Sequence, residues 1–397
     1  MTERFANHSK LPDVGTTVFT VMSRRAAETG AINLGQGFPD YPIDPRLPEL
    51  VQQAMAAGHN QYAPMPGVPA LLEQIAAKIK RVHAVDVDPH DEITVTLGAT
   101  EAIFSSVQAL AGAGDEVLVF DPAYDSYDPA VRLAGARCVH VPLAPPRFRP
   151  DWDRVRSSIN ERTRLVIINS PQNPACSCLD RDDLDTLAEL LRDRDCRVLS
   201  DEVYEHMVYD GARHQGVLAH PELRERSVAV FSFGKTLHAT GLRVGYAVAP
   251  PALTAELRKV HQYNTFTIAT SFQHAIAAYL RERPDVGADL SAWFQAKRDY
   301  FAALLEGTGL VLLPSAGSYF QLADFSNVDS RADVELATAL VDEAGVATIP
   351  LSVFYRERPR MTLLRLCFAK RDETLAEGAL RLRRWTESRR RPQATIR

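Results

Sequence analysis

The chain predicts an α/β fold in which a large domain is built on a mostly parallel central sheet. Between residues 92 and 284, short apolar runs of strand length alternate with amphipathic stretches at helical spacing. Five of these strands end in a residue that suits ligand binding, and in a parallel sheet such strand ends meet at one edge. The 397 residues suffice for two domains. A second domain is expected to open with the long helix after Pro284.

The composition is that of an ordinary globular protein, with 46% hydrophobic and 24% charged residues. The 45 basic and 50 acidic residues give a net charge of −5, which argues against a nucleic-acid-binding surface. The five cysteines are scattered, and Cys176-x-Cys178 without companion ligands gives no reason to expect a metal. Because reduced thiols suit the cytosol, and no signal-peptide core or membrane-length apolar run occurs, we expect a soluble cytoplasmic protein.

Helical periodicity predicts helices over residues 16–30, 47–57, 69–82, 101–110, 151–159, 181–194, 252–260, 271–281, 288–306 and 333–344. Apolar runs of strand length predict strands over residues 92–97, 116–120, 137–142, 163–169, 196–199, 228–231, 245–248, 310–313, 317–322 and 363–368.

The first strand end that suits a ligand is Gly98-Ala99-Thr100, a small-residue turn between the strand over 92–97 and a helix. A strand, turn and helix in this order point free N–H groups and a helix dipole at a phosphate. Many α/β folds contain this arrangement, so the turn alone does not identify a site.

Three further strands end in Tyr124, Asn173 and Asp201. Tyr124 suits stacking on a flat ring, although a core or surface aromatic is the usual role. The Asn173 side chain can donate to a phenolate oxygen. A carboxylate at the end of a buried strand needs a partner, which is either an ordinary salt bridge or a protonated ring nitrogen.

The fifth strand is followed by Lys235, with Ser232 before it and Arg243 after it. A lysine in this position commonly packs its aliphatic stem against the protein and keeps its ammonium group in water. Alternatively, the amine is desolvated in a pocket, so that its pKa falls and it can form a Schiff base. The hydroxyl, the amine and the guanidinium together suit a cofactor that carries an aldehyde and a phosphate.

The sequence S-F-G-K-T-x-x-x-T-G-x-R-x-G-Y around Lys235 resembles the lysine motif of the class I aminotransferases, which are pyridoxal-phosphate enzymes. N-L-G-x-G-x-P-D at 33–40, D-E-x-Y at 201–204 and R-L-C-F-A-K at 365–370 extend the resemblance over nearly the whole chain. It is nearest to the methionine and kynurenine/glutamine aminotransferase branch. It implies an aspartate-aminotransferase-like fold, with a smaller α+β domain formed from both chain ends, and the ranges 1–45 (arm), 46–284 (large domain) and 285–397 (small domain).

The resemblance also implies the site. Lys235 would form the Schiff base with pyridoxal 5′-phosphate and act as general base, Asp201 would protonate the ring nitrogen and Tyr204 would contact the phenolic oxygen. The remaining cofactor contacts would come from Gly98, Ala99, Thr100, Tyr124, Asn173, Ser232, Arg243 and, across a homodimer interface, Tyr62 of the neighbouring subunit. The substrate would lie on Gly37, Asn173 and Arg365, with the α-carboxylate on Arg365.

Two points concern the substrate. The family pattern N-P-x-G has Cys176 in place of the glycine here, so the loop after Asn173 is expected to differ. Aromatic residues indicate an apolar or aromatic side chain on the substrate; these are Phe19, Phe38, Tyr62, Tyr124 and Phe354. Methionine is favoured, with phenylalanine, tyrosine, glutamine and kynurenine behind it, and the reaction would be a ping-pong transamination that yields a 2-oxo acid. The alternatives are a cysteine-conjugate β-lyase and a pyridoxal-phosphate-binding regulator without turnover.

Overall fold

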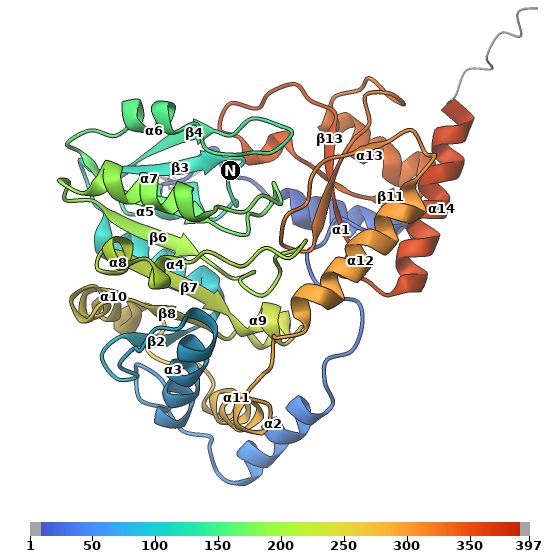
Figure 1. Ribbon diagram of the computed structural model, residues 1–397. Coiled ribbons are helices and arrows are strands. Elements are labelled where there is room, and N and C mark those ends of the chain that lie inside the picture. Colours follow the sequence, from blue (N-terminus) through green and yellow to red (C-terminus); the bar gives the residue numbers. More distant parts are fainter. Residues whose placement is uncertain (1–8, 390–397) are drawn as a thin grey trace, which may run out of the picture.

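A large twisted sheet forms the centre of the computed structural model, which describes residues 9–389 (Figure 1). Its strands, in spatial order, are β2 (Ile93–Thr96), β8 (Gly245–Val248), β7 (Ser227–Ser232), β6 (Arg197–Asp201), β5 (Thr163–Asn169), β3 (Glu116–Asp121) and β4 (Arg137–Pro142). All neighbours from β7 to β4 pair in parallel, whereas β8 runs antiparallel to both β2 and β7. The prediction of a mostly parallel sheet is confirmed.

Helices cover both faces of this sheet and bury two apolar layers against it. One layer involves α4 (Gly98–Leu110), α5 (Tyr127–Leu133) and α10 (Pro251–Asn264). The other involves α3 (Pro69–His83), α6 (Trp152–Ser158), α7 (Arg181–Leu191), η1 (Val217–Ala219) and α8 (Pro221–Arg224). Helices α2 (Arg46–Ala56) and α11 (Thr270–Glu282) pack on each other below β2 in Figure 1.

A smaller antiparallel sheet lies to the right in Figure 1. Its strands, in spatial order, are β12 (Ile349–Pro350), β13 (Leu363–Cys367), β10 (Phe320–Asp324) and β9 (Val311–Leu312). Its helices are α12 (Leu290–Leu305), α13 (Asp333–Ala344), η3 (Ser352–Phe354) and α14 (Asp372–Arg389).

The start of the chain joins this second unit. Strand β1 (Ile32–Asn33) pairs in parallel with β11 (Val346–Ala347), and α1 (Val18–Thr29) packs against α13. The smaller α+β domain is therefore built from both chain ends, as the resemblance implied.

Local sequence explains where several helices begin and end. The Thr17 hydroxyl accepts from the Thr20 N–H at the start of α1, and Gly30 ends that helix in the left-handed region, with a φ of 68°. Pro69 is the first residue of α3, where its missing N–H costs no hydrogen bond. Asp180 and Asp183 form a capping box at the start of α7.

Four α-helices of residues 9–389 were not predicted. Helix α5 follows β3 after a short loop, the one-turn helix α8 precedes β7, the one-turn helix α9 (Phe233–Thr236) carries Lys235, and α14 ends the described residues. Lys235 therefore sits on a helical turn after β7 rather than directly at the strand end. The 3-10 turn η2 (Thr240–Leu242) then leads into β8. Within residues 9–389, none of the helices combines the length and apolar character needed to cross a membrane.

Candidate active site

The carboxyl ends of the parallel strands surround a cavity of about 140 Å³. Its lining residues are Ala99, Thr100, Ile103, Tyr124, Asn169, Asn173, Asp201, Val203, Tyr204, Ser232, Lys235 and Arg243. Nine of these were predicted from the sequence; eight lie at or just after the ends of five strands, and Arg243 lies just before β8. The cavity forms because parallel strands bring their ends to one edge.

Lys235 lies half-buried in this cavity, and its amine is held by groups from the second domain. Its Nζ donates to Tyr319 Oη at 2.7 Å and lies 3.5 Å from the Gly37 carbonyl oxygen. Burial lowers the pKa of Lys235 to about 8, because the charged form loses hydration. A large fraction of the amine is thus neutral near that pH and able to attack a carbonyl.

Asp201 is 4% exposed and faces the same cavity. Tyr127 Oη donates to its Oδ2 at 2.6 Å. Burial raises the pKa of Asp201 to about 6, and the Tyr127 hydrogen bond opposes that rise. A protonated ring nitrogen would stabilise the buried carboxylate further.

The turn into α4 lies against Arg243 and β8. Gly98 has a φ of +70°, and a Cβ there would lie 2.6 Å from Arg243 Nη2. A Cβ on Gly245 would lie 2.6 Å from both the Gly98 carbonyl carbon and the Ala99 nitrogen. Glycine at these two positions therefore allows the start of α4, β8 and the guanidinium to meet, where helix N–H groups and Arg243 suit a phosphate.

Arg365 is 1% exposed on β13. Its Nη1 donates to Asn173 Oδ1 at 2.5 Å and its Nη2 to the Gly35 carbonyl at 2.9 Å, while Nε has no hydrogen-bond partner within the described chain. Among residues 9–389 no carboxylate forms an ion pair with it. Because a buried cation without a counter-ion is costly, this guanidinium is suited to receive a carboxylate from a ligand.

The loop after Asn173 does not open away from the site. Cys176 has a φ of 63°, in the left-handed region that glycine favours, and its N–H donates to the Gln172 carbonyl at 2.9 Å. Its own carbonyl accepts from the Ala316 and Gly317 N–H groups. Cysteine is thus held in a left-handed backbone conformation, and Asn173 reaches both the cavity and Arg365.

Gly37 reaches the site through its carbonyl, but Tyr62 does not reach it within one chain. Tyr62 is 86% exposed and lines a separate hollow of about 410 Å³ with residues 267–270. Its ring packs edge-on against Phe266, with the ring centroids 5.6 Å apart. Of the other predicted substrate contacts, Phe19 and Phe354 lie beside the Arg365 guanidinium, whereas Phe38 lies beside Lys370.

Sequence reasoning missed several residues of this site. Asn169, the last residue of β5, had the same strand-end position as the residues that were predicted. Tyr127 and Tyr319 had no such signal, because each meets its partner only after the chain folds back over a long separation. Ile103 and Val203 supply apolar lining.

Known proteins that are similar in sequence to this chain are aminotransferases. The family model for aminotransferase class I and II matches residues 29–382. Methionine aminotransferase of Escherichia coli is 48% identical over 375 residues, which cover 94% of this chain and 97% of that protein. A probable N-succinyldiaminopimelate aminotransferase of Mycobacterium tuberculosis is 40% identical, with 94% and 97% covered. Kynurenine–oxoglutarate transaminase 3 of Rattus norvegicus is 31% identical, with 97% and 91% covered.

Solved structures agree as well. The E. coli structure described as identifying a methionine aminotransferase function matches with a TM-score of 0.94 at 48% identity, over 96% of this chain and all of that one. A double mutant of the aspartate aminotransferase of Thermus thermophilus matches with a TM-score of 0.87 at 29% identity, over 96% of this chain and 100% of that one. The predicted fold and the resemblance to this family are confirmed, and the chain belongs to the class I and II aminotransferases.

Proposed function

We propose that the cavity binds pyridoxal 5′-phosphate. The residues fit that cofactor: Lys235 offers an amine of lowered pKa, Asp201 a buried carboxylate, and the start of α4 a cradle that a Cβ would fill. The contacts proposed for the phosphate are Gly98, Ala99, Thr100, Ser232 and Arg243, those for the ring are Tyr124, Asn173, Asp201 and Tyr204, and Lys235 would hold the aldehyde carbon. When bound, the cofactor supplies a ring that draws electrons from the substrate α-carbon.

The reaction we propose is transamination of an L-amino acid to its 2-oxo acid by a ping-pong mechanism. Arg365 binds the α-carboxylate in two hydrogen bonds and so fixes the substrate. Lys235 Nζ, in its neutral form, removes the proton from the α-carbon and delivers it onward as general base and acid. The Tyr319 hydroxyl and the Gly37 carbonyl hold that amine in place.

The substrate we propose carries an apolar side chain, and methionine is favoured. The observation that carries this proposal is the unpaired, buried Arg365 lying among aromatic rings: its guanidinium carbon is 3.8 Å from the Phe320 ring centroid and 5.1 Å from that of Phe19. In the described part of the chain, the cavity lining includes one arginine, Arg243, which we assign to the phosphate. A second carboxylate on the substrate would thus lack a guanidinium partner there.

We further propose a cytoplasmic homodimer with active sites at the interface. Tyr62 and Phe266 are large exposed aromatic residues that touch each other. Such paired aromatics are typical of interface positions, and they support a role for Tyr62 at the neighbouring subunit's phosphate. The arm, large domain and small domain are assigned to 1–45, 46–284 and 285–397.

The visible absorbance spectrum tests these proposals. We expect the protein reconstituted with pyridoxal phosphate to be yellow, and the yellow band to be lost when L-methionine is added without any keto acid. A band that methionine leaves unchanged but a dicarboxylic amino acid removes would refute the substrate assignment. Pyruvate and ammonia released from a cysteine conjugate without a keto acid would indicate the lyase instead.

A matched variant tests the lysine. Lys235→Ala is expected to lose the yellow band and the methionine half-reaction, because no other amine lines the cavity in residues 9–389. Normal transamination by this variant would refute the assignment of Lys235. If the protein binds the cofactor through Lys235 but converts none of a panel of amino acids, the alternative of a regulatory protein without turnover is favoured.

A further inference from the structure

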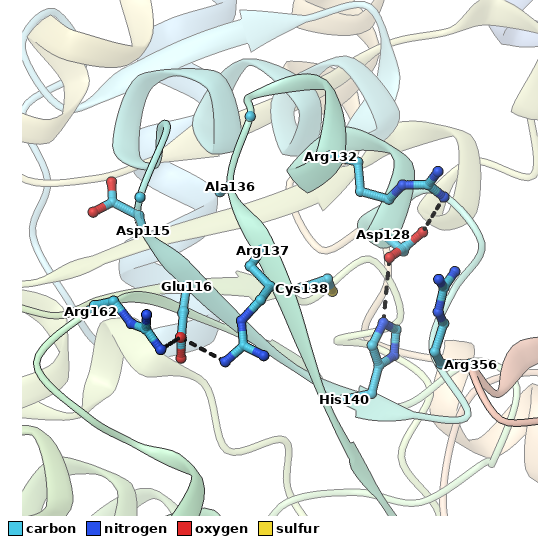
Figure 2. Close-up of a pocket in the computed structure, with 12 residues that line it drawn as sticks. Asp115, Glu116, Asp128, Arg132, Ala136, Arg137, Cys138, His140, Arg162 and Arg356 are labelled. Carbon is cyan, nitrogen blue, oxygen red and sulfur yellow. Dashed lines mark hydrogen bonds and ion pairs between the residues drawn. The ribbon is translucent and has the colours of Figure 1, made fainter. Parts of the chain in front are cut away.

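A hollow of about 510 Å³ lies at strand β4, an outer edge of the large sheet. Three side chains of metal-ligating type meet on one side of it (Figure 2). Cys138 and His140 are two residues apart on β4 and so project to the same face, while Asp128 lies in the first turn of α5. One ligating atom from each lies within 4.8 Å of the other two, and all three side chains are partly buried.

The imidazole of His140 is already oriented by a carboxylate behind it. Its Nδ1 is 2.8 Å from Asp121 Oδ1, and its Nε2 is 3.4 Å from Asp128 Oδ1. Metal-binding histidines commonly donate one ring N–H to a carboxylate, which leaves the other nitrogen free for the metal. The Asp121 contact thus presents His140 Nε2 toward Asp128.

The arginines around the hollow are each paired with a carboxylate. Arg132 Nη1 donates to Asp128 Oδ2 at 3.2 Å, which leaves Oδ1 on the side of His140. Arg132 and Arg356 both pair with Asp13. Their charge is therefore partly balanced outside the three-residue cluster.

The other two arginines lie at the far side of the hollow. Arg137 and Arg162 both pair with Glu116, at 2.7 and 2.6 Å (Figure 2). The Glu116 carboxylate thus partly balances their charge.

We propose that Asp128, Cys138 and His140 form a binding site for a tetrahedral transition-metal cation such as Zn²⁺. A carboxylate oxygen, a thiolate and a neutral imidazole nitrogen are ligands that zinc prefers. The Cys138 thiol and the His140 Nε2–H, which faces Asp128, each release a proton to solvent, and the two negative charges of thiolate and carboxylate then neutralise the cation. Side-chain movements of about 1 Å bring the ligand atoms to bonding distances of roughly 2.0–2.3 Å.

The fourth ligand is a water from the open hollow. Three protein ligands with one open position are typical of exchangeable rather than purely structural zinc sites. Because the ligands come from β4 and α5, two regular elements that pack on each other, the site is held by the fold rather than by a loop.

Cobalt titration of the purified holoenzyme tests this site. A thiolate ligand bound to Co²⁺ gives a charge-transfer absorption band in the near ultraviolet. Subtracting the spectrum of the metal-free enzyme removes the absorbance of the cofactor and leaves this band. We expect one equivalent to bind with this band, and Zn²⁺ to displace it. Cys138→Ser is expected to abolish the band, and His140→Gln to weaken binding at least tenfold.

Cys178→Ser is the matched control, since Cys178 is also a partly buried free thiol but lies outside the cluster. It is expected to keep both the band and the affinity. The absence of a band in the wild-type protein, or a band that survives Cys138→Ser, would overturn the proposal. Asp128→Asn provides an independent readout if Cys138→Ser does not fold: unchanged cobalt affinity in that variant would also count against the site. None of these readouts depends on transaminase activity.

Discussion

Asp201 and Lys235 are both poorly hydrated in the cavity, and burial shifts each of them toward its neutral form. The pKa of the carboxyl rises to about 6 and that of the amine falls to about 8. Neither shift comes from its local sequence. Both come from burial in the folded cavity, where the Tyr127 hydroxyl donates to the carboxylate and opposes its shift, and the Tyr319 hydroxyl accepts from the amine.

Asp201→Asn is expected to stabilise the cofactor-free protein at neutral pH while it impairs transamination. Because the folded-state pKa is raised from 3.8 to about 6, the folded state binds more protons than the unfolded state between those values, and stability falls as pH rises through that window. The variant removes this penalty, so its gain of about 1–3 kcal/mol in unfolding free energy should be full above pH 6 and vanish toward pH 4. Urea unfolding of both apo-proteins across this range measures the gain, and a gain that does not change with pH would contradict the assignment.

Tyr319→Phe is expected to lower kcat about 10- to 100-fold with little change in KM, because a hydrogen bond to a charged group contributes about 1.5–3 kcal/mol. The lost hydroxyl contacts Lys235 and Gly37, not the carboxylate-binding Arg365. Tyr209→Phe is the control, since it also removes a buried hydroxyl, here bonded to the Ser318 carbonyl. Steady-state kinetics with methionine separate the two, and equal losses in both variants would indicate a general packing effect.

At the scale of elements, the site depends on how closely β8 approaches the start of α4. Gly245 lies in the middle of this contact, and the atoms that a Cβ would strike are backbone atoms of Gly98, Ala99 and Phe231 at 2.6–2.8 Å. Backbone cannot move aside as a flexible side chain can. The strand and the helix must therefore separate if a methyl group is added.

Gly245→Ala is accordingly expected to weaken pyridoxal phosphate binding at least tenfold and to lower the unfolding temperature, since overpacking costs about 1–3 kcal/mol. Gly241→Ala, four residues earlier, is the control, because a Cβ there meets nothing within 4 Å. Fluorescence titration of the two apo-proteins with the cofactor gives the affinities. If the Gly245→Ala variant binds pyridoxal phosphate as tightly as the wild type, the close contact between β8 and α4 does not shape the phosphate site.

At the scale of the whole molecule, one predicted contact has no place within a single chain. Tyr62 lies in its own hollow, exposed and beside Phe266, apart from the cavity that holds Lys235. A cyclic two-fold dimer would let each chain supply this tyrosine to its partner.

Subunit mixing tests that arrangement. Lys235→Ala and Tyr62→Ala homodimers are both expected to be impaired, but a mixed dimer holds one site with both Lys235 and Tyr62 intact. Equal mixing with free exchange should restore about a quarter of the wild-type activity, because half the dimers are mixed and each has one complete site of two. If mixing restores nothing although exchange is shown by labelled subunits, Tyr62 does not act across the interface.

Much of the fold and site could be predicted because the relevant signals are local. Strands β4, β5 and β8 and helix α13 have the predicted limits, since their apolar periodicity and flanking residues set them. The strand-end residues were found because a parallel sheet gathers its carboxyl ends. The one-turn helix α9 that carries Lys235 was missed, because a four-residue helix has no periodicity to detect.

The kind of chemistry can be read from the chain: it contains the amine, the carboxylate and the guanidinium, and each follows a predicted strand in a set order. How those groups behave depends on the folded structure. Three features depend on contacts between elements: the lowered pKa of Lys235, the absence of an ion pair at Arg365 within residues 9–389, and the proximity of Cys138 to Asp128. The physical reason is that desolvation and charge balance depend on packing over the whole fold, which no stretch of sequence specifies alone.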